Sequence, residues 1–134
     1  MRSIGTSLLV SLALLLSTCD EMARSRFASA GDARRDIAYR NLIPSALPDS
    51  AYEIFVECDL DTNTAQGSFR FTQADTDSLR SRLQPLPAGV QSWGFRFDRA
   101  QYERQGFEFF HMEKFCIAVN WIACEAHFWF DPRA

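Results

Sequence analysis

The chain has 134 residues, a formal net charge of −3 and a hydrophobic fraction of 47%, including twelve Phe and three Trp. This composition excludes disorder for most of the chain, and the length suits a single domain. The mild acidity argues against nucleic acid as a partner, because nucleic-acid-binding domains are basic and cluster their Lys and Arg.

The beginning of the chain predicts a secretory signal. Arg2 supplies a positive charge, and residues 4–16 form an almost unbroken apolar run. This is the layout of a signal peptide. The run is shorter than the roughly 20 residues that a helix needs to cross a bilayer. The segment Leu16-Ser17-Thr18-Cys19 that follows resembles the lipobox of bacterial lipoproteins.

The resemblance implies that the chain is cut before Cys19 and carries lipid on this cysteine, so the membrane is an expected partner. The next residue, Asp20, resembles the signal that keeps lipoproteins of enteric bacteria in the inner membrane. We therefore expect an anchor on the periplasmic side of that membrane. Ordinary secretion, with cleavage elsewhere, and a retained membrane anchor are the alternatives.

The sequence divides into three expected regions. These are a signal peptide over residues 1–18, a lipid-anchored tether and arm over residues 19–48, and a single α+β domain over residues 49–134. The second region has few large apolar residues and many Ala, Ser and Arg. Asp32 is a candidate N-cap for a short helix that ends before Pro44. Its arginines suit either contact with anionic lipid headgroups or a solvated linker.

Apolar residues at alternate positions predict a half-buried strand over residues 52–60 and a second strand over residues 65–72. Turn-forming residues separate the two strands, so we expect a hairpin. Residues 75–84 predict a helix that ends before Pro85. The residues expected to face inward on the first strand are Tyr52, Ile54, Val56, Cys58 and Leu60.

The rest of the chain predicts further strands over residues 93–97, 107–113, 115–121 and 124–130. Residues 99–105 are expected to form a helical turn or a loop. Together these patterns predict an α+β fold, with a mostly antiparallel sheet of five or six strands and one or two helices packed on one face.

Three cysteines remain besides Cys19. In an oxidising compartment this number suggests one disulfide and one free thiol. Cys116 and Cys124 would oppose each other in a hairpin centred on Asn120, so they are the favoured disulfide pair. A bond to Cys58, or no bond, is the alternative. Cys58 shares a strand face with apolar residues and is expected to be buried and inert.

The sequence predicts no catalytic site, no metal site and no cofactor. His111, Cys116, Cys124 and His127 are zinc-type ligands, but their spacing fits no known finger. Strand alternation also places Cys124 and His127 on opposite faces of the sheet. The chain has no nucleophile elbow and no Gly-rich phosphate loop.

Large aromatic residues crowd the last third of the chain and fall on both faces of their strands. One face must belong to the core, and the other predicts either a second core or an exposed interface. Trp129 shares its strand face with two polar neighbours, which favours an interface there. The interface candidates are Trp129, His127, Glu125 and Trp93.

These observations lead to a hypothesis and two alternatives. The hypothesis is a periplasm-facing lipoprotein that binds another envelope or secreted protein and has no catalytic activity. Inhibitors, immunity proteins and envelope accessory proteins often have this layout, which is an analogy of architecture and not a motif match. The alternatives are an envelope structural or maintenance protein without a discrete ligand and, from another class, a small hydrolase or metal-dependent enzyme using His111 or His127.

Overall fold

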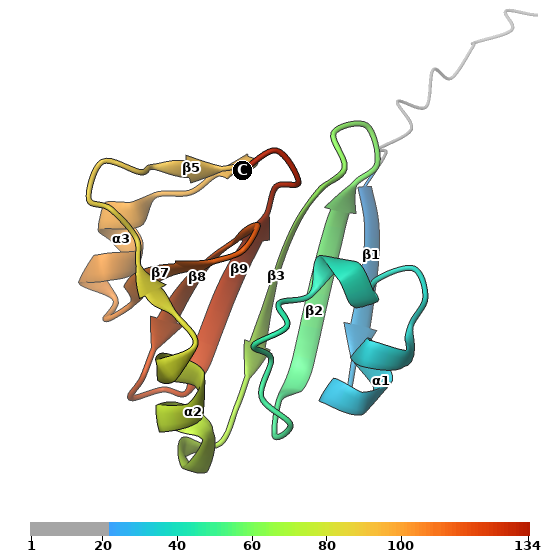
Figure 1. Ribbon diagram of the computed structural model, residues 1–134, viewed down its shortest axis with the longest axis horizontal. Helices are drawn as coiled ribbons and strands as arrows, with labels where there is room; N and C mark the ends of the chain where they lie inside the picture. Colours follow the sequence, from blue (N-terminus) through green and yellow to red (C-terminus); the bar gives the residue numbers. More distant parts are fainter. Residues whose placement is uncertain (1–21) are drawn as a thin grey trace, which may run out of the picture.

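A single large antiparallel sheet forms the centre of the structure, a computed structural model that describes residues 22–134 (Figure 1). It contains seven strands, in the spatial order β1-β2-β3-β9-β8-β7-β4. The strands are β1 (Met22–Phe27), β2 (Tyr52–Asp59), β3 (Thr64–Arg70), β4 (Gln84–Pro85), β7 (Glu108–Met112), β8 (Phe115–Asn120) and β9 (Glu125–Phe130). The prediction of a mostly antiparallel sheet is confirmed, but the sheet has seven strands where five or six were expected.

Short helices connect the strands. They are α1 (Ala30–Arg35), α2 (Thr76–Ser81), α3 (Arg99–Arg104) and the 3-10 turns η1 (Arg40–Leu42) and η2 (Gln73–Asp75). The first two α-helices pack on one face of the sheet, and α3 packs on the other. The helices therefore cover both faces, whereas the sequence predicted them on one.

The first core lies between one face of the sheet and the helices α1 and α2. Period-two alternation places Ile54, Val56 and Cys58 of β2 in this core, as predicted. Phe69 of β3 and Phe128 of β9 complete its centre. The same prediction was wrong for Tyr52 and Leu60. Both side chains are exposed, because they lie at the two ends of the strand.

Residues 22–48 belong to the folded domain, which differs from the tether and arm predicted over residues 19–48. The strand β1 pairs with β2 along its whole length. Helix α1 begins at Ala30, because the Ser29 hydroxyl, and not Asp32, caps its first turn. Residues 43–47 then cross the first core. The buried members of this region are Ala30, Ala33, Ile43, Ala46 and Leu47.

A second core lies on the opposite face of the sheet, over β7, β8 and β9. Trp129, Phe109 and Cys116 point into it and are covered by α3 and by the segment that precedes α3. The Arg99 guanidinium holds that cover together, donating hydrogen bonds to the carbonyls of Leu86, Pro87 and Val90.

The segment before α3 is a tight hairpin and not the single strand predicted over residues 93–97. The strands β5 (Ser92–Trp93) and β6 (Phe95–Arg96) pair with each other and form a separate two-stranded sheet. Gly94 makes the turn with a φ of +75°, a conformation that glycine adopts without steric cost. A strand pattern of alternating residues cannot reveal this reversal.

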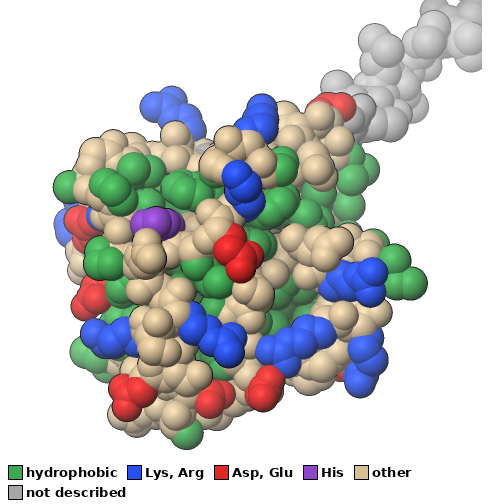
Figure 2. Space-filling view, in the orientation of Figure 1, with side chains coloured by type: hydrophobic (Ala, Val, Ile, Leu, Met, Phe, Trp, Pro, Cys, Tyr) green, Lys and Arg blue, Asp and Glu red, His purple; other side chains and the backbone are tan. Residues whose placement is uncertain are grey.

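The surface mixes charges of both signs. On the face shown in Figure 2, basic and acidic side chains lie next to one another with apolar side chains between them. No large patch of one charge covers this face. Among residues 22–134 no helix is long and apolar enough to cross a membrane.

Candidate binding groove

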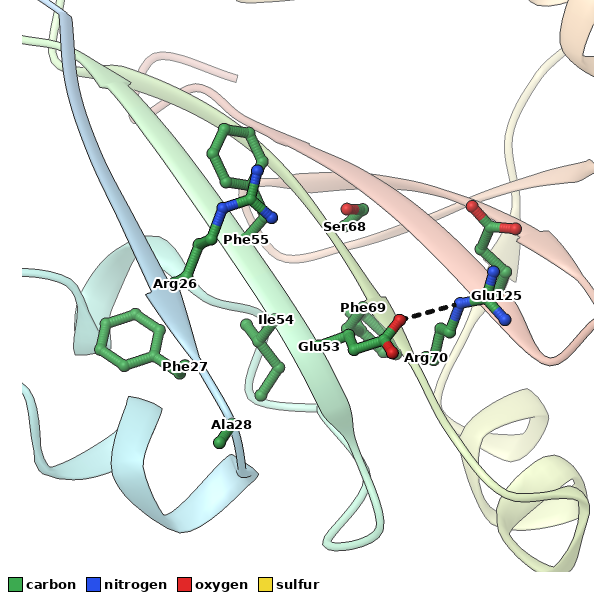
Figure 3. A pocket seen from close by; sticks show the side chains of 10 residues that line it. All are labelled: Arg26, Phe27, Ala28, Glu53, Ile54, Phe55, Ser68, Phe69, Arg70 and Glu125. Carbon is green, nitrogen blue, oxygen red and sulfur yellow. Dashed lines mark ion pairs between the residues drawn. The ribbon is translucent and has the colours of Figure 1, made fainter.

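The second face of the sheet is covered over β7, β8 and β9 but hollowed over β1, β2 and β3. One hollow, of about 460 Å³, crosses these three strands and reaches Glu125 of β9 (Figure 3). Another, of about 250 Å³, continues toward Tyr102 of α3. Both hollows are lined by Phe55 and Ser68, so we treat them together as the groove.

A row of side chains across four strands forms the floor of the groove. The register pairs Arg26 of β1 with Phe55 of β2, Phe55 with Ser68 of β3, and Ser68 with His127 of β9. Residues directly opposite each other in adjacent strands point to the same face. The pairing therefore brings together four residues that lie far apart in the sequence.

Three pairs of charged or polar side chains contact each other in and beside the groove. The Arg24 guanidinium lies 3.0 Å from a Glu57 carboxylate oxygen. The Arg70 guanidinium lies 3.3 Å from the Glu53 carboxylate (Figure 3). The third pair joins the His127 Nε2 and a Glu125 oxygen, 3.1 Å apart.

Arg26 differs from these residues. Its guanidinium lies over the Phe55 ring, 4.9 Å from the ring centroid. Within residues 22–134 it has no ion pair with a carboxylate. Figure 3 shows this pair at one end of the hollow, the Glu53–Arg70 pair at the other, and Ser68 between them.

A β-bulge shapes the end of the groove that lies beside Arg70. The register between β2 and β3 shifts between Tyr52 and Phe55, and Glu53 has a φ of +47°. A non-glycine residue in this conformation costs about 1–3 kcal/mol. Bulges redirect the side chains beside them. Here the bulge places the Glu53 carboxylate next to Arg70, on the groove side of the sheet.

The histidine of the groove is held by protein groups on both ring nitrogens. The His127 Nε2 lies 3.1 Å from a Glu125 carboxylate oxygen, and the Tyr102 hydroxyl lies 3.4 Å from His127 Nδ1. Burial, and then the negative charge of Glu125, raise the pKa of the Tyr102 phenol. The phenol therefore stays protonated at neutral pH and can donate to the imidazole. This arrangement orients His127 but leaves neither ring nitrogen for a substrate.

The structure separates the four interface candidates. His127 and Glu125 line the groove. Trp129 borders the smaller hollow, but its side chain is only 3% exposed and lies against Phe97, 4.6 Å away between ring centroids. Trp93 lies on β5, away from the groove, and its indole donates a 2.7 Å hydrogen bond to the Lys114 carbonyl.

Sequence reasoning missed Arg26, Phe55, Ser68 and Arg70 as groove residues. One signal was present, because Phe55 occupies a polar-phase position between Glu53 and Glu57. A large apolar residue on the outer face of a strand indicates a contact beyond the core. The other residues gave no signal, since their proximity depends on the order of the strands.

The predicted disulfide is absent, and the three cysteines of the described chain are free. Cys116 opposes Trp129 in the sheet, because the last hairpin turns over residues 121–124 and not around Asn120. Cys116 packs in the second core and Cys124 beside the first. Their side chains therefore lie on opposite faces of the sheet.

Burial also affects the chemistry of the cysteines. It raises the pKa of the Cys116 thiol to about 12, against a smaller opposing effect of Arg99. Burial, followed by the charge of Asp59, raises the pKa of Cys58 as well. Residues 22–134 hold no group of three or more potential metal ligands. Cys19, with the rest of the predicted signal and lipidation site, lies outside the described residues.

Comparison with known proteins adds one finding. Residues 21–70 match the family model described as the YbbD head domain. The match covers less than half of the chain and includes β1, β2 and β3, which carry the groove. Neither curated proteins nor solved structures give a significant match.

Proposed function

We propose that this chain is a lipid-anchored module on the periplasmic side of the inner membrane that binds another envelope or secreted protein through the groove. In this proposal the protein has no catalytic activity. The lipid is carried by Cys19, as the lipobox resemblance implies.

The observation that carries the proposal is the contrast between the two halves of the second sheet face. One half is sealed by the second core, and the other is left as a groove. Its larger hollow has a volume of about 460 Å³. Arginine and aromatic side chains, which line it, are enriched at the centres of protein interfaces.

The pairing of charged groups favours binding over catalysis. A general base needs an unoccupied nitrogen or oxygen within reach of the substrate. In the groove the acidic and imidazole groups are engaged with other side chains of the protein, as the contacts of Glu53, Glu125 and His127 illustrate. Such a surface is suited to recognition by shape and charge.

A capture experiment tests the binding function. Full-length protein is cross-linked in native membranes, and the captured proteins are compared between the wild type, Phe55→Ser and the control Ile37→Ser. Ile37 is 81% exposed and lies outside the groove. We expect Phe55→Ser to reduce capture of the same partner at least about tenfold, a loss typical of an interface hot spot.

The control variant should capture as much partner as the wild type. Equal capture by Phe55→Ser and wild type would place the interface elsewhere and contradict the proposal.

The anchor is tested separately by the intact mass of the membrane-purified protein. A mass that begins at Cys19 with acyl chains added supports it, and a mass that retains Met1 or lacks acyl chains contradicts it.

A further inference from the structure

We propose that Arg26 makes the groove a receptor for a carboxylate on a polypeptide segment. The inference rests on the proposed binding function and names the chemistry of the partner. The carboxylate comes either from an acidic side chain or from the end of a chain, and both sources present the same two oxygens.

The pairing of side chains in the groove points to an anion at Arg26. The carboxylates of Glu53 and Glu125 already have cationic or imidazole partners. Arg24, on the same face of the same strand, is paired with Glu57. Arg26 thus brings a guanidinium that forms no ion pair with a carboxylate within residues 22–134. A ligand that supplies a carboxylate here would complete the pairing.

The position of Arg26 suits this task. Its guanidinium is held against the Phe55 ring by a cation–π contact, which orders the long side chain before a ligand arrives. A guanidinium presents donors in a planar fork that matches the two oxygens of a carboxylate. The pre-ordered fork therefore favours a carboxylate over a neutral group of the same shape.

The neighbouring surface suits a polypeptide segment. Ser68 follows Phe55 in the same row across the sheet, and its hydroxyl makes no hydrogen bond to another described residue. Phe55 itself adds apolar surface to the same hollow. A main-chain amide of a bound segment can use the hydroxyl while an apolar side chain covers this surface.

A simpler role for Arg26 makes a different prediction. Arginine on an edge strand discourages pairing with the edges of other sheets. Arg24 would share that role, because it occupies the same strand and the same face two residues away. If Arg26 recognises a carboxylate, its loss should weaken ligand binding while the loss of Arg24 should not. Arg24 is therefore the matched control.

The experiment uses three short peptides with the full-length, ¹⁵N-labelled protein. N-acetyl-Phe-Asp-amide carries a side-chain carboxylate, N-acetyl-Phe-Gly carries a terminal one, and N-acetyl-Phe-Asn-amide is the neutral isostere. Binding is followed by the amide shifts of Phe55 and Ser68. We expect at least one carboxylate peptide to bind at least about tenfold more tightly than the isostere, and more weakly at high salt.

Arg26→Gln should weaken this binding at least about tenfold, whereas Arg24→Gln should change it by less than about twofold. The amide spectra also report whether each variant is folded. The carboxylate peptide that binds more tightly identifies the source. Equal binding of the isostere, equal losses in the two variants, or no saturable shift with either carboxylate peptide would overturn the inference. Partner capture that depends on Phe55 but not on Arg26 would overturn it while leaving the proposed function intact.

Discussion

At the scale of single residues, Gly67 occupies a crowded position of β3. A Cβ atom there would lie 2.1 Å from the Phe55 carbonyl oxygen and 2.5 Å from the Phe128 ring. Both neighbours belong to the sheet or the first core and cannot move freely. The floor of the groove and the packing beneath it therefore depend on the absence of a side chain.

We predict that Gly67→Ala lowers the free energy of unfolding by about 3 kcal/mol, the upper part of the range for overpacked cores. The control is Gly89→Ala, because a Cβ at Gly89 meets nothing within 4 Å. Urea denaturation followed by circular dichroism measures both variants. A loss for Gly67→Ala no larger than for Gly89→Ala would contradict the close packing.

The cysteines give a second prediction at this scale. In the folded protein at pH 8, iodoacetamide should modify the partly exposed Cys124 and leave the buried Cys116 unmodified until urea unfolds the chain. Peptide mass mapping distinguishes the two sites. A Cys116–Cys124 disulfide would instead protect both cysteines after unfolding without reductant.

The raised pKa of Cys116 also makes stability depend on pH. A thiol with a pKa near 12 in the folded state and about 8.5 when unfolded favours folding in its neutral form. That stabilisation is complete below about pH 8.5 and is lost as pH rises toward 12. Cys116→Ala should remove this part of the alkaline dependence, which urea denaturation at several pH values measures.

At the scale of elements, Trp129 joins β9 to α3. Its ring lies 4.6 Å from Phe97 and 5.5 Å from Tyr102, between centroids. We predict that Trp129→Ala lowers the free energy of unfolding by about 3–5 kcal/mol, as for other buried aromatics. The control Ile122→Ala, at a side chain that is 99% exposed, should change it by less than about 0.5 kcal/mol.

Denaturation and hydrogen exchange measure these effects. Exchange in residues 86–107 should rise in Trp129→Ala, because the cover of the second core loses its main contact. An intact fold combined with lost partner capture would instead support the exposed interface that the sequence suggested for Trp129.

The sequence analysis did not predict the strand β1, and the residues of this strand explain why. Toward the first core it presents Ala23, Ser25 and Phe27, paired with residues of β2. Toward the groove it presents Arg24 and Arg26. Only one of the three core-side residues is large, so the apolar alternation that identifies a strand is too weak to detect. Pairing along β2 stabilises the strand in its place.

At the scale of the whole molecule, β1 fixes the orientation that a lipid anchor would impose. Only Asp20 and Glu21 separate Cys19 from Met22 in the sequence. Met22 pairs with Asp59, so the β2–β3 turn lies at the same end of the sheet. Asp59 pairs with Thr64, and Arg70, opposite Glu125, is six residues further along β3, about 20 Å at about 3.4 Å per residue. The distal end of the groove would then face away from the membrane.

Two tryptophan variants test this orientation in proteoliposomes that contain lipids brominated on their acyl chains. Leu60 is 64% exposed in the β2–β3 turn, and Ile122 is 99% exposed in the turn at the opposite end. We predict that the emission added by Leu60→Trp is quenched and that added by Ile122→Trp is not. Each is compared with the wild type, which supplies the emission of the three native tryptophans.

Vesicle flotation separates the possible failures. Protein that floats without quenching of Leu60→Trp would be anchored in another orientation. Protein that does not float would contradict the anchor itself. Stronger quenching of Ile122→Trp than of Leu60→Trp would reverse the orientation.

The sequence by itself determined which residues of a strand share a face. Alternation correctly assigned Ile54, Val56 and Cys58 to the core and separated Phe128 from Trp129. This works because side chains in a strand point to opposite faces with a period of two. The helix near residue 79 and the mostly antiparallel sheet followed from equally local patterns.

Only the tertiary structure decided what covers each face. Trp129 became core because α3 and residues 86–97 lie over it, and Phe55 stayed accessible because nothing comparable covers β2. The row from Arg26 to His127 exists because β3 pairs with β9 across more than fifty residues of intervening chain. Such pairings depend on contacts between segments that are distant in the sequence, so a local pattern cannot predict them.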